Sequence, residues 1–230
     1  MAGKIWVIIP AAGNGSRFNV SSLAKQYYLV LGKSVLEHTV SIFLAFFQDN
    51  TKNIIIPLSK NDQHFSTLKI ATHPKIQPIE GGETRAESVL KALQALKKIA
   101  QKDDWVLVHD AARPCLSQRD LQTLIDTLKN DPVGGILGMP VKDTLKTVIS
   151  GEIQETLNRD IIWHAFTPQM YRYGILLEAM TKAPSSVTDE ATAVKAAQYV
   201  SRMVVGIDPN PKLTVKQDAA YITFLLSQKV

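Results

Sequence analysis

Six short apolar runs, separated by longer amphipathic segments, constrain the fold of this chain more than any other feature. The runs span residues 4–10, 53–58, 75–80, 104–110, 133–140 and 201–207. Several are apolar nearly throughout, as is typical of strands that are covered on both faces of a sheet. The alternation of strands and helices predicts an α/β fold in which a mostly parallel, twisted sheet carries helices on both faces.

The segments between the runs show helical spacing and helical start signals. One segment places apolar residues at i, i+3, i+4 and i+7, namely Leu121, Leu124, Ile125 and Leu128. Capping-box patterns predict helix starts at Ser34 with Glu37, Thr84 with Glu87, Thr214 with Gln217 and, more loosely, Ser117 with Asp120. The stretch "TDEA" (188–191) is explained structurally by a threonine cap that is followed by two acids in a first helical turn.

One segment breaks this alternation. Residues 141–159 form two short β-rich runs that meet at Ser150 and Gly151, where a helix would otherwise be expected. This pattern is typical of a β-hairpin. We therefore predict a single domain over residues 1–230, with a β-hairpin arm at about 141–159 that projects from the sheet.

Composition narrows the functional classes. The formal net charge of +5 and a pI of about 9.2 suit an anionic small ligand, and no run of lysines or arginines predicts binding to nucleic acid. The single cysteine, Cys115, excludes an internal disulfide framework and is expected to be buried and inert. The five histidines have no spacing typical of metal ligands. Without an apolar stretch of 18 residues or a convincing signal peptide, a cytoplasmic location away from the membrane is expected.

The loop "PAAGNGSRF" (10–18) follows the first predicted strand and is nearly bare of side chains until Arg17. Such a loop can close its backbone N–H groups around a phosphate, and an arginine adds a fixed charge. Phe18 stands where the dinucleotide fingerprint needs its third glycine, and Tyr27 stands where a Walker A motif needs its first. The loop therefore predicts a triphosphate site of another kind, with a glycine-rich turn and a surface arginine as the alternative. Lys25 could offset charge at the same phosphates or be a solvated surface lysine.

A series of motifs resembles the 2-C-methyl-D-erythritol 4-phosphate cytidylyltransferases of the non-mevalonate isoprenoid pathway. In chain order the motifs are "PAAGNGSRF", "KQY", "GGETRAESV", "VHDAARP", "DTLK", "NRDIIWHAFTPQ", "TDEA" and "PKLT". They extend from residue 4 to the last predicted helix, and "HDAARP" and "WHAFTPQ" are far more specific than the glycine loop. The resemblance implies a Rossmann-like sheet of the nucleotide-diphospho-sugar transferase type. It also implies transfer of a cytidylyl group from CTP to methylerythritol phosphate, with Mg²⁺ as the cofactor.

The resemblance implies a role for each matching residue on the nucleotide side. The CTP phosphates and ribose would be wrapped by Ala11, Ala12, Gly13 and Gly15. Arg17 and Lys25 would stabilise the transition state at the α- and β-phosphates. The cytosine would be held by Gly82 and Ser88, although "GGETRAES" is also explained as a turn and a helix start.

On the acceptor side, Asp110 would lie between the nucleotide and the sugar phosphate. Its direct contact with Mg²⁺ is left open, because the ion could be held mainly by CTP phosphates. The contacts to methylerythritol phosphate would come from Arg113, Thr144, Arg159, Thr167 and Lys212, and Arg159 and Lys212 would position its phosphate for attack. Lys212 could instead be a loop lysine, and Thr167 could merely cap the turn at Pro168.

A general base is not expected, because a phosphate monoester is already anionic at neutral pH; His109 is predicted to be a packed residue. The resemblance also implies a homodimer in which the arm embraces the neighbour and brings Thr144 to its site, with Arg159 as a further candidate. Val30 stands where relatives often have proline. Three alternatives stay open: a ribitol 5-phosphate cytidylyltransferase, a uridylyl- or adenylyltransferase of the same fold, and a nucleotide-binding regulator without turnover.

Overall fold

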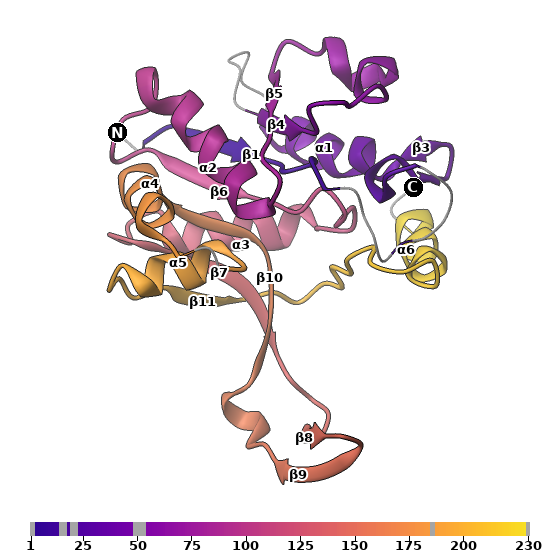
Figure 1. Ribbon diagram of the computed structural model, residues 1–230, viewed down its shortest axis with the longest axis vertical. Coiled ribbons are helices and arrows are strands. Elements are labelled where there is room, and N and C mark those ends of the chain that lie inside the picture. Colours follow the sequence, from indigo (N-terminus) through magenta and orange to yellow (C-terminus); the bar gives the residue numbers. More distant parts are fainter. Residues whose placement is uncertain (1–2, 14–17, 19–22, 48–53, 185–186, 229–230) are drawn as a thin grey trace.

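The computed structural model describes residues 3–13, 18, 23–47, 54–184 and 187–228. Its centre is a seven-stranded sheet in the order β11-β7-β10-β6-β1-β4-β5 (Figure 1). The strands are β1 (Ile5–Ile8), β4 (Ile54–Leu58), β5 (Ile76–Glu80), β6 (Trp105–Val108), β7 (Gly134–Pro140), β10 (Trp163–Arg172) and β11 (Arg202–Val205). Six of these seven strands lie within the apolar runs of the sequence, which confirms the predicted strands and the mostly parallel sheet.

Strand β10 was not predicted, and it is the strand that makes the sheet mixed. It runs antiparallel between β6 and β7, whereas the other neighbouring strands of this sheet are parallel. Its register against β7 shifts between Ala165 and Gln169. The shift takes Thr167 out of the regular ladder with β7, and this residue lies beside the end of β6, where the site is formed.

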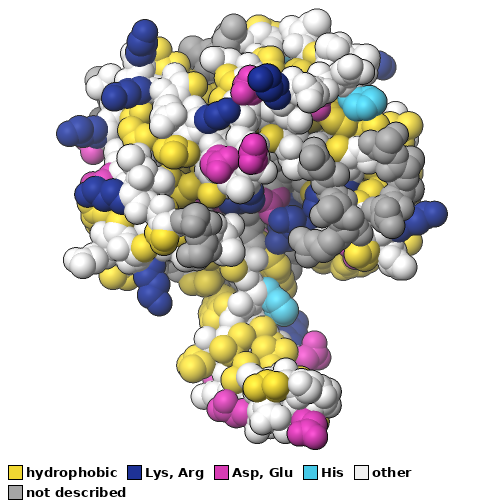
Figure 2. Space-filling model, in the orientation of Figure 1, with side chains coloured by type: hydrophobic (Ala, Val, Ile, Leu, Met, Phe, Trp, Pro, Cys, Tyr) yellow, Lys and Arg dark blue, Asp and Glu magenta, His cyan; other side chains and the backbone are white. Residues whose placement is uncertain are grey.

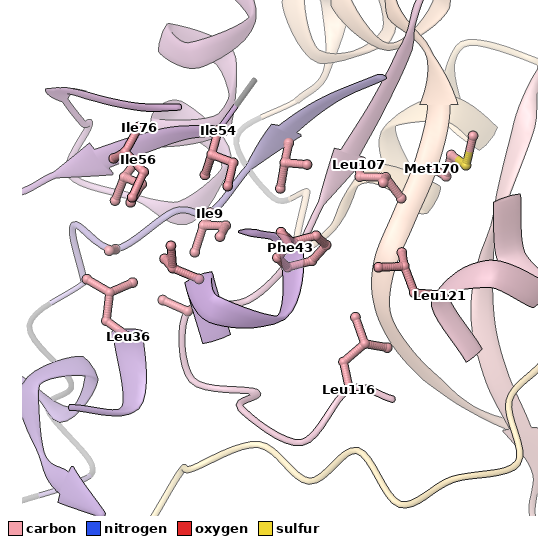
Figure 3. Packing of buried hydrophobic residues seen from close by; sticks show 14 of the residues in the cluster. Ile9, Leu36, Phe43, Ile54, Ile56, Ile76, Leu107, Leu116, Leu121 and Met170 are labelled. Atoms are coloured by element: carbon pink, nitrogen blue, oxygen red, sulfur yellow. The ribbon is translucent and has the colours of Figure 1, made fainter. Parts of the chain in front are cut away.

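Helices cover both faces of the sheet, as predicted. The helices are α1 (Val35–Phe46), α2 (Arg85–Ala95), α3 (Gln118–Leu128), α4 (Tyr173–Lys182), α5 (Glu190–Ala196) and α6 (Asp218–Ser227), with short 3₁₀ turns at Lys25–Tyr27, Phe65–Thr67, Lys69–Thr72, Leu96–Lys98 and Arg159–Ile161. Apolar side chains of α1 and α3 share one core cluster, and those of α2, α4 and α5 share another. Figure 3 shows Leu36 and Phe43 packed below the sheet side chains of Ile9, Ile54 and Ile56. Each face of the sheet is therefore anchored by its own core.

A third, smaller cluster joins α6 to a two-stranded hairpin formed by β2 (Leu29–Val30) and β3 (Lys33–Ser34). Val30 contributes to this cluster and is 3% exposed. Cys115 also belongs to the cluster and is buried, as predicted. The cluster holds the C-terminal helix against the segment that follows the glycine loop.

The helix starts test the predicted caps. Both capping boxes at Ser34 and Thr84 are present, and Ser117 accepts a hydrogen bond from the Asp120 N–H. The prediction at Thr214 is wrong, because α6 begins after Gln217 and the Asp218 carboxylate accepts the N–H groups that precede the helix. The predicted cap at Thr188 is also wrong. Asp189 is the N-cap of α5 and accepts the N–H of Thr192, because the helix starts one residue later.

The arm is a two-stranded hairpin, as predicted, of β8 (Lys146–Ile149) and β9 (Glu152–Thr156). Ser150 and Gly151 both have positive φ angles, of 50° and 87°, as a two-residue hairpin turn of type I′ requires. The hairpin extends far from the sheet (Figure 1), and nearly all of its residues are exposed. Figure 2 shows hydrophobic side chains gathered on the arm, and among its exposed apolar residues are Val148, Ile149, Ile153 and Ile161.

No helix within the described ranges is long and apolar enough to cross a lipid bilayer.

Candidate active site

A cavity of about 270 Å³ lies at the carboxyl ends of β1 and β6. Ligands of open α/β sheets bind at this edge, beyond the ends of the strands. Seven of the residues that the sequence predicted for the site line the cavity: Ala11, Ala12, Gly13, Lys25, Ser88, Asp110 and Lys212. Figure 2 shows lysine, arginine and acidic side chains close together at the centre of this face. The cavity therefore collects segments that lie up to two hundred residues apart in the chain.

The first wall is the loop after β1. The Ala11 N–H donates to the carbonyl of Pro57 at 2.8 Å, so the chain leaves the sheet alongside β4. The side-chain amide of Gln26 then donates to the carbonyl oxygens of Ala11 at 2.8 Å and Gly13 at 3.2 Å. By holding these two carbonyls, Gln26 fixes the orientation of the loop peptides. Sequence reasoning missed Gln26, although it stands in the "KQY" motif. Gly15 and Arg17 lie outside the described residues.

Lys25 begins a short 3₁₀ turn, Lys25–Tyr27, that carries it to the cavity. The turn is anchored by the Tyr27 hydroxyl, which donates to the Asp62 carboxylate at 2.5 Å. Burial and the neighbouring Asp62 raise the pKa of Tyr27 far above its usual range, so the phenol stays protonated and keeps donating. Lys25 is thus a lysine of the cavity wall, which is the geometry that a role at the phosphates requires.

Asp110, just beyond β6, is the centre of the charges in the cavity. Its Oδ1 accepts from Arg85 Nε at 2.8 Å, and its Oδ2 accepts from Lys212 Nζ at 2.7 Å. Arg113 Nε lies 3.6 Å from the same Oδ2. Burial alone would raise the pKa of Asp110, but the charges of Arg85, Lys212 and Arg113 outweigh it and hold that pKa far below its usual range. Asp110 is therefore ionised at any physiological pH.

His109 and Thr167 fix the backbone on which Asp110 is mounted. The Asp110 N–H donates to Thr167 Oγ1 at 3.1 Å, and Thr167 Oγ1 lies 3.1 Å from His109 Nδ1. His109 Nε2 lies 3.0 Å from the Arg113 carbonyl, which can only accept, so the neutral ring carries its proton on Nε2. Burial lowers the pKa of His109 to about 4. His109 is a packed, neutral residue, as predicted.

Arg113 lies close to Asp110, but its guanidinium reaches toward Asn210, in the segment between β11 and α6. Its NH1 donates to the Asn210 carbonyl at 2.6 Å, and its guanidinium carbon lies 5.4 Å from the ring centre of Phe166. The Asn210 side chain donates in turn to the Thr167 carbonyl at 2.8 Å. Arg113 and Thr167 are thus brought beside Asp110. Their contact with a substrate stays a prediction.

The predicted base-binding residues lie at the start of α2. Ser88 lines the cavity, and Gly82 lines an adjoining groove of about 920 Å³. The Ser88 hydroxyl accepts the Gly82 N–H at 3.0 Å and donates to the Thr84 carbonyl at 2.9 Å. Ser88 lies outside the Thr84–Glu87 capping box, so the capping and binding interpretations of this segment are compatible. A Cβ atom on Gly81 would lie 2.7 Å from Ala12 Cβ, so this position accepts only glycine without a local shift.

Sequence reasoning missed Arg85 and Glu190, which form an ion pair beside the cavity between a fully buried carboxylate and a partly exposed arginine. Arg85 NH1 and NH2 donate to the two oxygens of Glu190 at 2.6 and 3.0 Å. Glu190 is fully buried rather than part of a solvated helical turn, so the structural interpretation of "TDEA" as a capped turn with two acids is incomplete. The sequence did contain a signal for this pair. Helix capping explains neither the arginine in "GGETRAES" nor the second acid in "TDEA", and these are the two residues that pair.

Thr144 and Arg159 are not brought to the cavity within one chain. Both are exposed, and both belong to the arm segment. Arg159 NH1 donates to the Lys142 carbonyl at 2.8 Å, at the base of the arm. The arm follows the carboxyl end of β7, and Figure 1 shows that it extends far from the rest of the chain. If these two residues contact substrate, they do so in a neighbouring copy or after a movement of the arm.

The known proteins that this chain resembles in sequence and in structure point to one family. The model of the IspD family, 2-C-methyl-D-erythritol 4-phosphate cytidylyltransferase, matches residues 5–228. The protein of that name from Haemophilus ducreyi is 44% identical, over 98% of this chain and 97% of the relative. The one from Vibrio vulnificus strain CMCP6 is 40% identical, over 96% and 94%.

Solved structures agree with this grouping. A crystal structure of 4-diphosphocytidyl-2C-methyl-D-erythritol synthase superposes with a TM-score of 0.85 at 35% identity, covering 98% of this chain and all of the other. The enzyme from Francisella tularensis gives a TM-score of 0.81 at 35% identity, covering 97% of this chain and all of the other. From the match over nearly its whole length, this chain belongs to the IspD family of 2-C-methyl-D-erythritol 4-phosphate cytidylyltransferases.

Proposed function

We propose that this chain transfers the cytidylyl group of CTP to 2-C-methyl-D-erythritol 4-phosphate, in the biosynthesis of isoprenoid precursors. The products are 4-diphosphocytidyl-2-C-methyl-D-erythritol and pyrophosphate. Membership of the family supports the reaction. One observation in the structure supports it most: a bare loop, Lys25 and Lys212 surround a single cavity with Asp110 at its centre.

The reaction is an in-line displacement. A phosphate oxygen of the acceptor attacks the α-phosphorus of CTP, and the bond to the β-phosphate oxygen breaks. The attacking phosphate is already anionic, so the neutral, buried His109 has no proton to remove. The role of the protein is alignment, worth roughly 7–11 kcal/mol in favourable cases, together with neutralisation of charge.

We assign the charged residues of the cavity to the two halves of this reaction. Lys25, together with Arg17, would stabilise the charge that develops at the α- and β-phosphates of CTP. Lys212 would hold the acceptor phosphate in line for attack, aided by Arg159. Ser88 and the Gly82 backbone would hold cytosine at the groove beside the cavity.

Mg²⁺ enters the proposal with CTP. The described residues contain no group of three or more His, Cys, Asp or Glu side chains that would hold a metal ion. Both oxygens of Asp110 already contact cationic side chains. These residues do not fit a Mg²⁺ ion held by the protein alone, which is in keeping with an ion held mainly by substrate phosphates and water. Direct coordination by Asp110 would require one of its cationic partners to move.

The arm supports a homodimer as the working state, and we propose that this enzyme acts in the cytoplasm. Its two strands are hydrogen-bonded to each other, and its exposed apolar side chains would be covered in a dimer. In such a dimer Thr144 and Arg159 would be supplied to the neighbour's cavity. This arrangement would explain why one chain alone does not bring them to its own site.

The test is pyrophosphate release from CTP, measured with methylerythritol phosphate and with ribitol 5-phosphate in turn, and then with UTP and ATP. Rapid release only with CTP and methylerythritol phosphate is expected, and release with ribitol 5-phosphate alone would contradict the proposed acceptor.

Lys25→Ala is expected to lower turnover by about 10²–10³ while leaving the melting temperature unchanged. Lys129→Ala is the control, because Lys129 is an exposed lysine at the C-terminal end of α3 that does not line the cavity, and it should turn over at the wild-type rate. Wild-type turnover by Lys25→Ala would remove Lys25 from the mechanism.

A further inference from the structure

Glu190 is a carboxylate with no exposed surface, and its position asks for an explanation. It stands at the first residue of α5, and both of its oxygens accept from Arg85. Burial raises the pKa of Glu190, because the ionised form loses its hydration. Replacing a buried ion pair by apolar residues of similar volume is often neutral or stabilising, so stability alone is a weak reason for such a pair. A role in the neighbouring cavity is the stronger reason.

The pair reaches the cavity through the third donor of Arg85. The guanidinium binds Glu190 through NH1 and NH2, which leaves Nε to donate to Asp110 Oδ1 at 2.8 Å. Arg85 itself lines the cavity, and its side chain is 26% exposed. A planar guanidinium that is bound at two edges cannot rotate without breaking one of the contacts. Glu190 thus fixes Arg85, and Arg85 fixes one oxygen of Asp110.

The two oxygens of Asp110 are thereby assigned to different cations. Oδ1 faces Arg85, and Oδ2 faces Lys212 at 2.7 Å. With Arg85 withdrawn, Oδ1 would be released and the carboxylate could turn so that both oxygens face Lys212. Lys212 would then be held more tightly by Asp110 and less available to an anionic ligand. The orientation of Asp110 therefore controls where the ammonium group of Lys212 lies.

We propose that Glu190 and Arg85 are positioning residues: through Asp110 they set the place of Lys212 in the cavity. This inference rests on the proposed function, in which Lys212 holds the acceptor phosphate. Neither Glu190 nor Arg85 needs to touch a substrate for this role. The contacts run from α5 through α2 to the end of β6 and on to the loop before α6, and they connect four segments that are remote in the sequence.

The variant Glu190→Gln tests the role with little change in shape. The amide keeps one acceptor oxygen but turns an NH₂ group toward a guanidinium N–H, so we expect Arg85 to rotate and its Nε to leave Asp110. We expect kcat to fall about 10–100-fold, as a displacement of about 1 Å at the reacting groups can cause. The KM for CTP should change less than about threefold, because the loop after β1 is untouched.

A double-mutant cycle separates positioning from general destabilisation. In a Lys212→Ala background, Glu190→Gln should lower kcat less than about threefold further, because the residue it positions is gone. The same loss in both backgrounds would overturn the proposal. Asp131→Asn is the matched control, since Asp131 is a buried carboxylate paired with Arg202 at the opposite end of the sheet. It is expected to lower the melting temperature and leave kcat unchanged.

A structural readout keeps this test independent of the reaction. In a crystal structure of Glu190→Gln, the Asp110 carboxylate should be turned and the contact between Arg85 Nε and Oδ1 lost. An unchanged Asp110 would overturn the positioning role, whatever the activity. A wild-type protein that does not release pyrophosphate from CTP would instead refute the proposed function, and the crystal structure would still decide whether Glu190 and Arg85 orient Asp110.

Discussion

The cavity and the arm differ in how much of each is buried and held by contacts within the chain. Around the cavity, the two carboxylates are held by ion pairs within the chain, and Asp110 is 8% exposed and Glu190 fully buried. In the arm, by contrast, all five residues of β9 are exposed. The first region is specified by contacts within one chain. A two-stranded hairpin is marginally stable on its own, so in the proposed homodimer the arm would gain its stability from a neighbouring copy.

This difference determines how a functional role can be inferred for a residue in each region. A polar residue near the cavity has its orientation fixed by identifiable partners, so its part in the chemistry follows from those partners. A residue on the arm has few partners in one chain, so the roles proposed for Thr144 and Arg159 rest on the proposed homodimer. Substitutions should therefore act on folding and chemistry in the body, and on association in the arm.

The largest expected effect is on stability in the body. Leu107 lies on β6 and is fully buried, whereas Ile153 on the arm is 66% exposed. We expect Leu107→Ala to lower the free energy of unfolding by about 2–5 kcal/mol, because it leaves a cavity in the core. Ile153→Ala should change it by less than about 0.5 kcal/mol. Denaturant unfolding, at a protein concentration where copies are separate, measures both. Equal losses would show that the arm is part of the folding unit of one chain.

Much of the body could be predicted because its signals are local. Apolar runs gave six strands, since a strand that is covered on both faces needs apolar residues on both. Ser34 and Thr84 were recognisable as caps because both partners of a capping box lie within four residues. Gly13, Lys25 and Asp110 meet in the cavity because each follows a strand or a loop at the same edge of the sheet.

The features that escaped prediction depend on distant partners. Strand β10 is written "WHAFTPQMYR", in which polar residues and a proline interrupt any apolar alternation, and its neighbours in the sheet decide its conformation. Arg85 and Glu190 lie 105 residues apart, and each has a local explanation in a helix start. The displaced starts of α5 and α6 are the exception: their reason is local, because Asp189 and Asp218 accept the N–H groups there in place of the threonines that were predicted as caps.

The next expected effect is a pH dependence that belongs to the body. Burial lowers the pKa of His109 from 6.5 to about 4. The unfolded chain therefore binds more protons than the folded chain between these values, and stability is lost as the pH falls through this window. The loss attributable to His109 should reach about 3 kcal/mol near pH 4. The depressed pKa of Asp110 acts only at lower pH, since its stabilising effect is lost below the unfolded value of about 4.

Unfolding of the wild type and of His109→Gln, compared from pH 7 to pH 4, measures this effect. Subtracting the two curves removes the contributions of other groups, among them Glu190, whose raised pKa acts in the opposite direction just above pH 4.5. The difference between the curves should shrink by about 3 kcal/mol across the window. Parallel curves would show that His109 is not held neutral by its burial.

The smallest expected effect on the stability of one chain, and the sharpest test of the arm, comes from Ile149→Asp. Ile149 is 66% exposed in a single chain, so a charge there should alter unfolding of the separated chain by less than about 0.5 kcal/mol. In a dimer that covers the arm, the same charge would be buried without a partner, so association should be lost. Sedimentation should then give the mass of one chain, and turnover should fall with it, because Thr144 and Arg159 would no longer reach a neighbour's cavity.

The matched control is Ile99→Asp. Ile99 lies on the body and is 53% exposed, so this variant should leave both mass and turnover unchanged. A variant that keeps the wild-type mass but loses turnover would place the arm in its own chain's reaction, and the division between body and arm would have to be redrawn.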